Sequence, residues 1–401
     1  MGRSLTSFTQ GWMELVVGPV KSGKSGSLIS SINSFRGAIN KEISDKELLV
    51  VKHPNDDKDL RHKISSFHKE NIDAIECETA DELVNLVNKN TKYIFISGIH
   101  LFDKNIVDLC DELVMSNRKI VASGINLTYD GKPYGNMPEL MAMADSYEIK
   151  RPICKFKFCS EEAYRTQKTI ENKFEPRCLT HYSFKNRPDY KPFLTNQMPS
   201  LEIVVGPMFS GKTDDLFTKV NQLKNKDNVA IFKWNKDKRY SHKYIISHNK
   251  DKIPAINIEN AEEIKSYLEK HKEIGYVIID EIQFIEGSYD LVNNLLYQGY
   301  QIFATGLKRD FRRKPFGDVP KLLTIADNII NKEAYCYKCG HPATETQRII
   351  IKNGVDYPAS YDDPTVLVGG KESYKAACRL HHKIKDAPAN KYNNRFNKIR
   401  I

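Results

Sequence analysis

Short apolar runs alternate with amphipathic stretches along both halves of the chain. Three runs rich in β-branched and aromatic residues occur in each half, at residues 48–51, 93–96 and 120–123, and again at 229–232, 276–279 and 302–305. Between such runs apolar residues return at helical spacing, as Leu216, Val220 and Leu223 do. Strands that alternate with helices are typical of a parallel sheet covered by crossover helices. The pattern therefore predicts an α/β fold in each half.

The two halves carry the same blocks in the same order. YIFISGIHLF (93–102) parallels YVIIDEIQFI (276–285), and GINLTYDGKPYGNMPELMAMAD (124–145) parallels GLKRDFRRKPFGDVPKLLTIAD (306–327). Both halves then end in a cysteine-containing segment closed by Cys-x-x-His. Recurrence of several blocks at similar spacing predicts a tandem duplication.

The duplication sets the expected domain boundaries. One copy covers residues 1–182 and the other covers 201–382, with a linker rich in Pro and Asn at 183–200. A basic tail, 383–401, is expected to be solvated.

Each copy opens with a strand, a glycine-rich turn and a helix. The turn reads GPMFSGKT at residues 206–213 and GPVKSGKS at 18–25. In this context G-x-x-x-x-G-K-[ST] binds phosphates, because backbone N–H groups and the helix N-terminus face anionic oxygens. Lys212 adds a mobile positive charge, and the Thr213 hydroxyl can bind magnesium. The sequence thus predicts binding of a nucleoside triphosphate.

Two adjacent acids follow a buried strand in the second copy. Asp280 is placed to bind magnesium beside the phosphate loop, and Glu281 projects from the other side of the chain as a candidate general base. Without further context, the two acids could also simply cap the strand end. Asp237 and Arg239 lie on a charged loop, where they could contact a sugar hydroxyl and a phosphoryl group.

An aromatic and basic loop, FRRKPFG, follows the strand at 302–305. Phe311 and Phe316 could wall a base pocket by stacking, and could equally be core residues.

Six of the eight cysteines fall into two groups with metal-ligand spacing. In the second copy two short-spaced pairs predict a structural, tetrahedral zinc site: Cys336, Cys339, Cys378 and His381. His382 is a less well-placed alternative to His381. The first copy offers a possible second zinc site, Cys154, Cys159, Cys178 and His181, although Phe156 aligns with the first cysteine and Cys154 would have to reach from two residues earlier.

Composition is typical of a soluble globular protein, with 40% hydrophobic and 28% charged residues. The net charge of +10 is compatible with anionic substrates, and nucleic acid is not an expected partner. No apolar run is long enough for a membrane helix. Metal-spaced cysteines indicate a reducing cytoplasm rather than a disulfide framework.

The second copy resembles the zinc-containing type II thymidine kinases over residues 201–382. The matching motifs are GPMFSGKT, DKRY, DEIQF, FRRKPFG, Cys-x-x-Cys and VGGKESYKAACRLH. The resemblance implies two RecA-like P-loop domains, each followed by a small zinc-ribbon and lasso subdomain (about 333–382 in the second copy). It also implies transfer of the ATP γ-phosphoryl group to the 5′-hydroxyl of thymidine, and of deoxyuridine, giving dTMP for nucleotide salvage and DNA synthesis.

The resemblance further implies a role for each matching residue. Glu281 takes the 5′-hydroxyl proton, with Arg239 and Lys212 at the phosphates. The nucleotide and its magnesium are bound by Gly206, Pro207, Met208, Phe209, Ser210, Gly211, Lys212, Thr213, Asp280 and Gln283. The nucleoside is bound by Met208, Asp237, Phe284, Leu307, Phe311, Phe316, Leu367, Gly369 and Tyr374, of which Asp237 contacts the sugar.

The first copy lacks several of these parts. Ser97 stands in place of Asp280, Gly98 in place of Glu281 and His100 in place of Gln283. Only 18 residues separate Cys159 from Cys178, against 38 between the corresponding cysteines of the second copy, and the VGG segment is missing. We therefore expect a pseudokinase, with a vestigial ATP site at Gly18, Gly23, Lys24 and Ser25.

Two alternatives remain open at this point. The chain could be a nucleotide-regulated binding protein, in which both phosphate loops are switches and the zinc ribbons and tail contact nucleic acid. It could also be a kinase with another base preference, such as deoxyuridine or deoxycytidine. Since the family forms tetramers, a homo-oligomer of tandem chains is a further expectation.

Overall fold

The computed structural model describes residues 10–38, 47–57, 61–183, 198–223, 228–235, 244–246 and 251–393. The chain divides into two compact units, Met1–Lys185 with Ala389–Ile401, and Asn186–Pro388. Each unit is described by itself. Within the described residues, none of the helices has the length and apolar character that crossing a bilayer requires.

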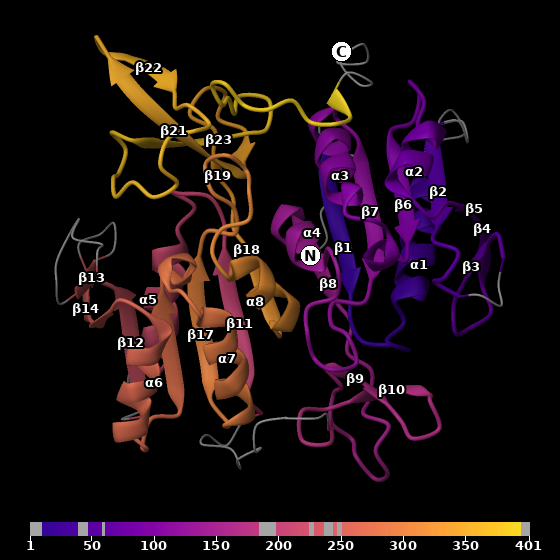
Figure 1. Cartoon of the computed structure of the whole chain (residues 1–401), viewed down its shortest axis with the longest axis horizontal. Coiled ribbons are helices and arrows are strands. Elements are labelled where there is room, and N and C mark those ends of the chain that lie inside the picture. The colour runs from indigo at the N-terminus through magenta and orange to yellow at the C-terminus, as the bar shows by residue number, and fades with distance from the viewer. Residues whose placement is uncertain are drawn as a thin grey trace. The chain divides into compact units, whose positions relative to one another are not determined.

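The first unit is built on a six-stranded parallel sheet flanked by helices (Figure 1). Its strand order is β5-β2-β6-β7-β1-β8. In chain order the strands are β1 (Trp12–Val17), β2 (Leu48–Lys52), β5 (Ile75–Glu76), β6 (Tyr93–Ser97), β7 (Lys119–Gly124) and β8 (Ser146–Ile149). The helices are α1 (Lys24–Ala38), α2 (Ala80–Leu86), α3 (Asn105–Met115) and α4 (Met137–Met143), with a 3-10 turn, η1 (Ile99–Leu101).

The second unit repeats this architecture with the strand order β15-β12-β16-β17-β11-β18. Its sheet strands are β11 (Ser200–Val205), β12 (Val229–Trp234), β15 (Ile256–Ile258), β16 (Tyr276–Asp280), β17 (Gln301–Gly306) and β18 (Asn328–Asn331). Its helices are α5 (Lys212–Leu223), α6 (Ala261–Lys270), α7 (Ser288–Tyr297) and α8 (Val319–Ile325), with η2 (Ile282–Phe284). The same order of parallel strands in both units confirms the predicted pair of α/β domains.

The central strands are buried along almost their whole length. β7 and the first four residues of β16 are fully buried, because helices cover both faces of a parallel sheet. In the first unit α1 supplies Leu28, Ile29 and Ile32 to a core that also holds Val50 and Phe95. The apolar runs in the sequence therefore mark the sheet core.

Small antiparallel elements complete each unit. The first unit has β3 (Lys63–Ser65) with β4 (Asn71–Asp73), and β9 (Arg165–Lys168) with β10 (Phe174–Arg177). The second unit pairs β13 (Tyr244–Ile246) with β14 (Lys252–Pro254), β19 (Ala334–Tyr335) with β20 (Pro342–Ala343), and β21 (Glu345–Lys352) with both β22 (Val355–Pro358) and β23 (Tyr374–Ala377). The larger subdomain of the second unit accommodates the longer segment between its cysteines.

The tail contradicts one expectation at Asn390–Tyr392. Tyr392 is buried, and its hydroxyl donates to Asp81 Oδ1 at 2.6 Å. Lys391 pairs with Asp81 Oδ2 at 2.9 Å, and the Asn390 amide donates to the Asp108 carbonyl at 3.0 Å. The prediction of a solvated tail is therefore wrong for these residues, which pack on α2 and α3 of the first unit.

Candidate active site

The phosphate loop of the second unit connects β11 to α5. Lys212 Nζ donates to the carbonyls of Gly206 and Pro207, at 3.2 and 2.9 Å. A Cβ on Gly206 would lie 2.6 Å from the Lys332 carbonyl oxygen, so only glycine fits there. The buried Ser210 hydroxyl has no hydrogen-bond partner among the described residues. Lys212, which bonds carbonyls of its own loop, and the unpaired Ser210 hydroxyl are both suited to bind phosphate oxygens.

The two adjacent acids lie at the end of β16. Asp280 Oδ1 accepts a hydrogen bond from the Thr305 hydroxyl on the neighbouring β17. Glu281 has φ +52°, a left-handed conformation that is rare for glutamate and is found at functional sites. Its Oε2 accepts from Gln283 Nε2 at 2.7 Å, and Gln283 Oε1 accepts from the Leu307 amide at 3.0 Å. Gln283 therefore fixes the Glu281 carboxylate relative to the loop after β17.

A pocket opens beside Glu281. Eight of the nine residues predicted to bind the nucleoside line it, together with Glu281 and Gln283: Met208, Phe284, Leu307, Phe311, Phe316, Leu367, Gly369 and Tyr374. The remaining one, Asp237, lies outside the described residues, as does Arg239. Phe311 is buried and also lines the pocket, so it is both a core residue and part of the pocket wall.

Sequence reasoning missed other residues of the pocket wall: Trp234, Asp310, Thr346, Thr365, Val366 and Val368. Trp234 stacks on Phe284, with ring centroids 4.2 Å apart and planes at 16°, and Phe284 meets Phe316 edge-on at 5.4 Å. One signal could have revealed Trp234. It follows Lys233, which pairs with Asp280, and the carboxyl ends of neighbouring parallel strands meet at one edge of a sheet.

The lasso, residues 365–370, is tied to the pocket by side-chain hydrogen bonds. The Tyr374 hydroxyl donates to the Leu367 carbonyl at 2.9 Å, and Arg312 donates to the Thr365 hydroxyl at 2.7 Å. Phe311 belongs to the loop 306–317, and its carbonyl accepts from His382 Nε2 at 3.0 Å. These contacts fix the positions of the lasso and of the loop 306–317, which form two walls of the pocket.

The buried carboxylate of Glu345 stabilises the loop 306–317 through ion pairs with its arginines. Glu345 is 2% exposed, and its oxygens lie 2.6 Å from Arg309, 3.6 Å from Arg379 and 3.8 Å from Arg313. Burial alone would raise the pKa of Glu345, but the three guanidinium groups hold it well below its usual range. Glu345 is therefore charged at all physiological pH values.

Both predicted cysteine and histidine groups assemble in space. In the second unit the ligand atoms of Cys336, Cys339, Cys378 and His381 all lie within 4.8 Å of one another. Three Cys and one His around a common centre fit a closed, structural zinc site. His382 is hydrogen-bonded to the Phe311 carbonyl instead, so the prediction of His382 as an alternative to His381 is wrong.

The four candidate ligands of the first unit come together in the same way. Cys154, Cys159, Cys178 and His181 also have their ligand atoms within 4.8 Å of one another. Cys154 Sγ lies 3.9 Å from His181 Nδ1, while Phe156 stacks on the His181 ring at 4.0 Å. Cys154 thus reaches the site from two positions early, and the displaced Phe156 covers the imidazole.

In both units the zinc subdomain contacts the phosphate loop in the same way. The Thr346 hydroxyl accepts from the Met208 amide at 3.1 Å, and the Thr166 hydroxyl accepts from the Val20 amide at 3.2 Å.

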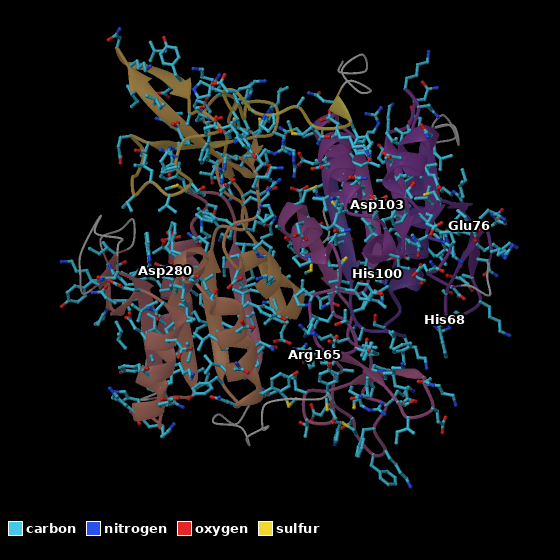
Figure 2. All side chains as sticks on the ribbon, in the orientation of Figure 1. His68, Glu76, His100, Asp103, Arg165 and Asp280 are labelled. Atoms are coloured by element: carbon cyan, nitrogen blue, oxygen red, sulfur yellow. The ribbon has the colours of Figure 1, made fainter. Side chains whose placement is uncertain are left out.

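The phosphate loop of the first unit, 18–25, resembles that of the second. Gly23 has φ +85°, and Lys24 Nζ donates to the Pro19 carbonyl at 2.6 Å. Burial lowers the pKa of Lys24 to about 8, and the Asp56 carboxylate partly opposes that shift. Burial also lowers the pKa of His100 to about 3, with further contributions from Lys24 and His53, so the imidazole is neutral. Figure 2 labels His100 in the first unit and Asp280 in the second.

Comparison with protein families identifies both copies. The family model described as thymidine kinase matches residues 11–176 and 199–382. The chain belongs to the thymidine kinase family. The two matched segments correspond to the two α/β units, in agreement with the duplication.

Proposed function

We propose that the second unit transfers the γ-phosphoryl group of ATP to the 5′-hydroxyl of thymidine, and that deoxyuridine is a second acceptor. The observation that carries this proposal is the shared wall: Glu281 lines the same pocket as the aromatic residues and the lasso. A carboxylate held at the edge of a base-sized aromatic pocket, next to a phosphate loop, is suited to deprotonate a nucleoside hydroxyl.

In this mechanism Glu281 accepts the proton of the 5′-hydroxyl as the oxygen bonds to the γ-phosphorus. The bond from that phosphorus to the β–γ bridging oxygen breaks, and ADP leaves with the electron pair. Lys212 and the loop amides stabilise the phosphate oxygens. Gln283 keeps Glu281 oriented through its 2.7 Å hydrogen bond, so the base needs no reorganisation before it reacts.

The chain offers ligands for the metal that such a transfer uses. Thr213 and Asp280, one hydroxyl and one carboxylate, fit the preference of magnesium for oxygen donors and would hold it. When bound, magnesium neutralises charge on the β- and γ-phosphates.

The pocket also accounts for nucleoside selection. We infer that the base stacks on the pair formed by Trp234 and Phe284, with Phe311 and Phe316 closing the sides. Backbone groups near Leu367 and Gly369 would meet the polar base edge, since Tyr374 fixes that part of the lasso. Hydrogen bonds to a substrate edge discriminate strongly, because a mismatched base leaves buried polar groups unpaired.

We assign no kinase chemistry to the first unit. Ser97 and Gly98 supply no carboxylate at the end of β6, and the chain between Cys159 and Cys178 is too short for a lasso.

We also propose a homo-oligomer of tandem chains in the cytoplasm. Both Cys–His groups need reduced thiols, and the eight cysteines form no disulfides.

A phosphotransfer assay with ATP and each of three nucleosides tests the proposal. Thymidine should give dTMP at the highest kcat/KM, deoxyuridine should follow, and deoxycytidine should react least. ATP binding without any nucleoside monophosphate as product would instead support the nucleotide-regulated binding protein.

A further inference from the structure

The register of the two sheets defines which positions correspond. In the second unit Lys233 pairs with Asp280, and in the first unit Lys52 pairs with Ser97. Ser97 therefore occupies the Asp280 position in space as well as in sequence, and the next residue, Gly98, occupies the position of Glu281. Both residues after the strand are left-handed, with φ +76° for Gly98 and +52° for Glu281.

A different carboxylate fills the space that these replacements vacate. Asp56 lies on the segment after β2, and its Oδ2 accepts from the Ser97 hydroxyl at 2.6 Å. A Cβ built on Gly98 would lie 2.6 Å from Asp56 Cβ and 2.8 Å from Asp56 Cγ. The Asp56 side chain therefore stands where a side chain at position 98 would begin.

A hydroxyl chain replaces the direct bond of the second unit. There, Thr305 donates to the Asp280 carboxylate. In the first unit Ser123 Oγ lies 3.4 Å from Ser97 Oγ, and Ser97 in turn donates to Asp56. In the first unit the Ser97 hydroxyl therefore stands between the Ser123 hydroxyl and the Asp56 carboxylate, which comes from another loop.

Two further groups lie near this region, since Asp56 interacts electrostatically with Lys24, and Lys24 with His100. Lys24 is half-buried in the loop, held by the Pro19 carbonyl and 3.3 Å from the Ser22 hydroxyl. His100 is only 6% exposed, and its Nδ1 has no hydrogen-bond partner among the described residues. A buried ring nitrogen without a partner indicates that the site is completed by water or a bound group.

We propose that the first unit binds a magnesium–nucleoside triphosphate and that Asp56 supplies the metal-side carboxylate lost at Ser97. Lys24 and the amides of residues 18–25 hold the phosphates, and Ser25 and Asp56 hold the metal. The site binds the triphosphate without phosphorylating a nucleoside, because the first unit lacks the lasso that holds an acceptor nucleoside in the second unit. This inference does not depend on which nucleoside the second unit accepts.

Isothermal titration calorimetry with ATP and MgCl2 counts the sites. In full-length Lys212→Met, where the second loop is disabled, one ATP site per chain should remain, and adding Lys24→Met should remove it. A Lys212→Met chain that is folded and binds no ATP would overturn the proposal.

The role of Asp56 is tested in the same Lys212→Met background. Asp56→Asn keeps the size of the side chain and should weaken ATP binding about 10–100-fold with magnesium, while binding in EDTA stays unchanged. The matched control is Asp57→Asn, an adjacent exposed carboxylate, which should change neither value. Equal magnesium-dependent affinity for Asp56→Asn and Asp57→Asn would refute the assignment.

A carboxylate swap tests the spatial argument independently of whether Asp56→Asn folds well. Gly98→Glu alone should lower the Tm, since its Cβ collides with Asp56. The double variant Asp56→Gly, Gly98→Glu removes the colliding Cβ of residue 56 and should regain both the Tm and the magnesium-dependent binding that Asp56→Gly lacks. If the double variant gains nothing over Asp56→Gly, Asp56 does not replace a carboxylate at this position.

Discussion

The buried Glu345 cluster gives the most quantitative prediction about how the pocket is held. The perturbation is Glu345→Gln, which keeps the shape of the side chain and removes its charge. Three guanidinium groups lie within 4 Å of this carboxylate, and Arg309 is itself buried. The variant therefore leaves buried positive charge without a counter-charge.

The magnitude follows from the competition between burial and pairing. At an effective dielectric constant of about 20, unit charges about 4 Å apart attract by roughly 4 kcal/mol. Three such pairs outweigh the desolvation of one carboxylate, which is why the pKa of Glu345 is depressed despite burial. Removing one partner of a buried ion pair costs about 3–5 kcal/mol. For a unit of this size about 1 kcal/mol corresponds to 2–4 °C, so the Tm of the second unit should fall by roughly 6–20 °C.

Differential scanning calorimetry of the full chain measures this loss. The control is Glu262→Gln, which removes an exposed pair with Lys265 on α6 and should leave the Tm unchanged. In kinetics, Glu345→Gln should raise the KM for thymidine, because Arg309 and Arg313 belong to the loop that carries Phe311 and Phe316. Equal Tm values for Glu345→Gln and Glu262→Gln would refute the reasoning.

The same cluster predicts a pH dependence of stability. Because the folded pKa of Glu345 lies below its unfolded value of about 4.3, its contribution is fully present above that pH. The contribution is lost as pH falls from there toward the folded pKa. Wild type should therefore lose stability more steeply than Glu345→Gln in acid, as measured by urea unfolding at several pH values.

Three further predictions concern zinc, the lasso and the tail. Metal analysis of the purified chain should find two zinc ions, and one in Cys336→Ser. Steady-state kinetics of Cys336→Ser should show a raised KM for thymidine. An unchanged zinc content in this variant would contradict the site. Tyr374→Phe removes the hydrogen bond to Leu367, worth about 0.5–1.5 kcal/mol, and should raise the KM for thymidine about 2–10-fold with little change in kcat. Tyr392→Phe removes the hydrogen bond to Asp81 and should make Lys391 more accessible to trypsin, whereas an unaltered digestion rate would mean that the docking is unimportant in solution.

Local patterns in the sequence were enough for the sheets, the phosphate loops and the metal groups. Each of these depends on residues close together in the chain or on strand ends that a parallel sheet brings to one edge. Predicting eight pocket residues required the family resemblance in addition, because the lasso reaches the pocket from about 80 residues beyond the end of β16.

Other features depend on loop conformations that no periodicity encodes. The sequence names Cys154 as a possible ligand, but only the loop conformation brings it into the metal group while Phe156 stacks on His181. Asp56 lies on the segment after β2, and its carboxylate lies against Ser97 because Gly98 leaves room for it. The contact of Tyr392 with Asp81 joins residues that are 311 apart, so it leaves no local signal.

The central claim is that one carboxylate, present in only the second unit, deprotonates the acceptor. The most direct test compares kcat for thymidine phosphorylation in Glu281→Gln and in Glu286→Gln, an exposed glutamate on the same segment. Glu281→Gln should lower kcat by about two to four orders of magnitude with ATP and thymidine still bound, and Glu286→Gln should match wild type. A Glu281→Gln enzyme that forms dTMP at the wild-type rate would contradict the account.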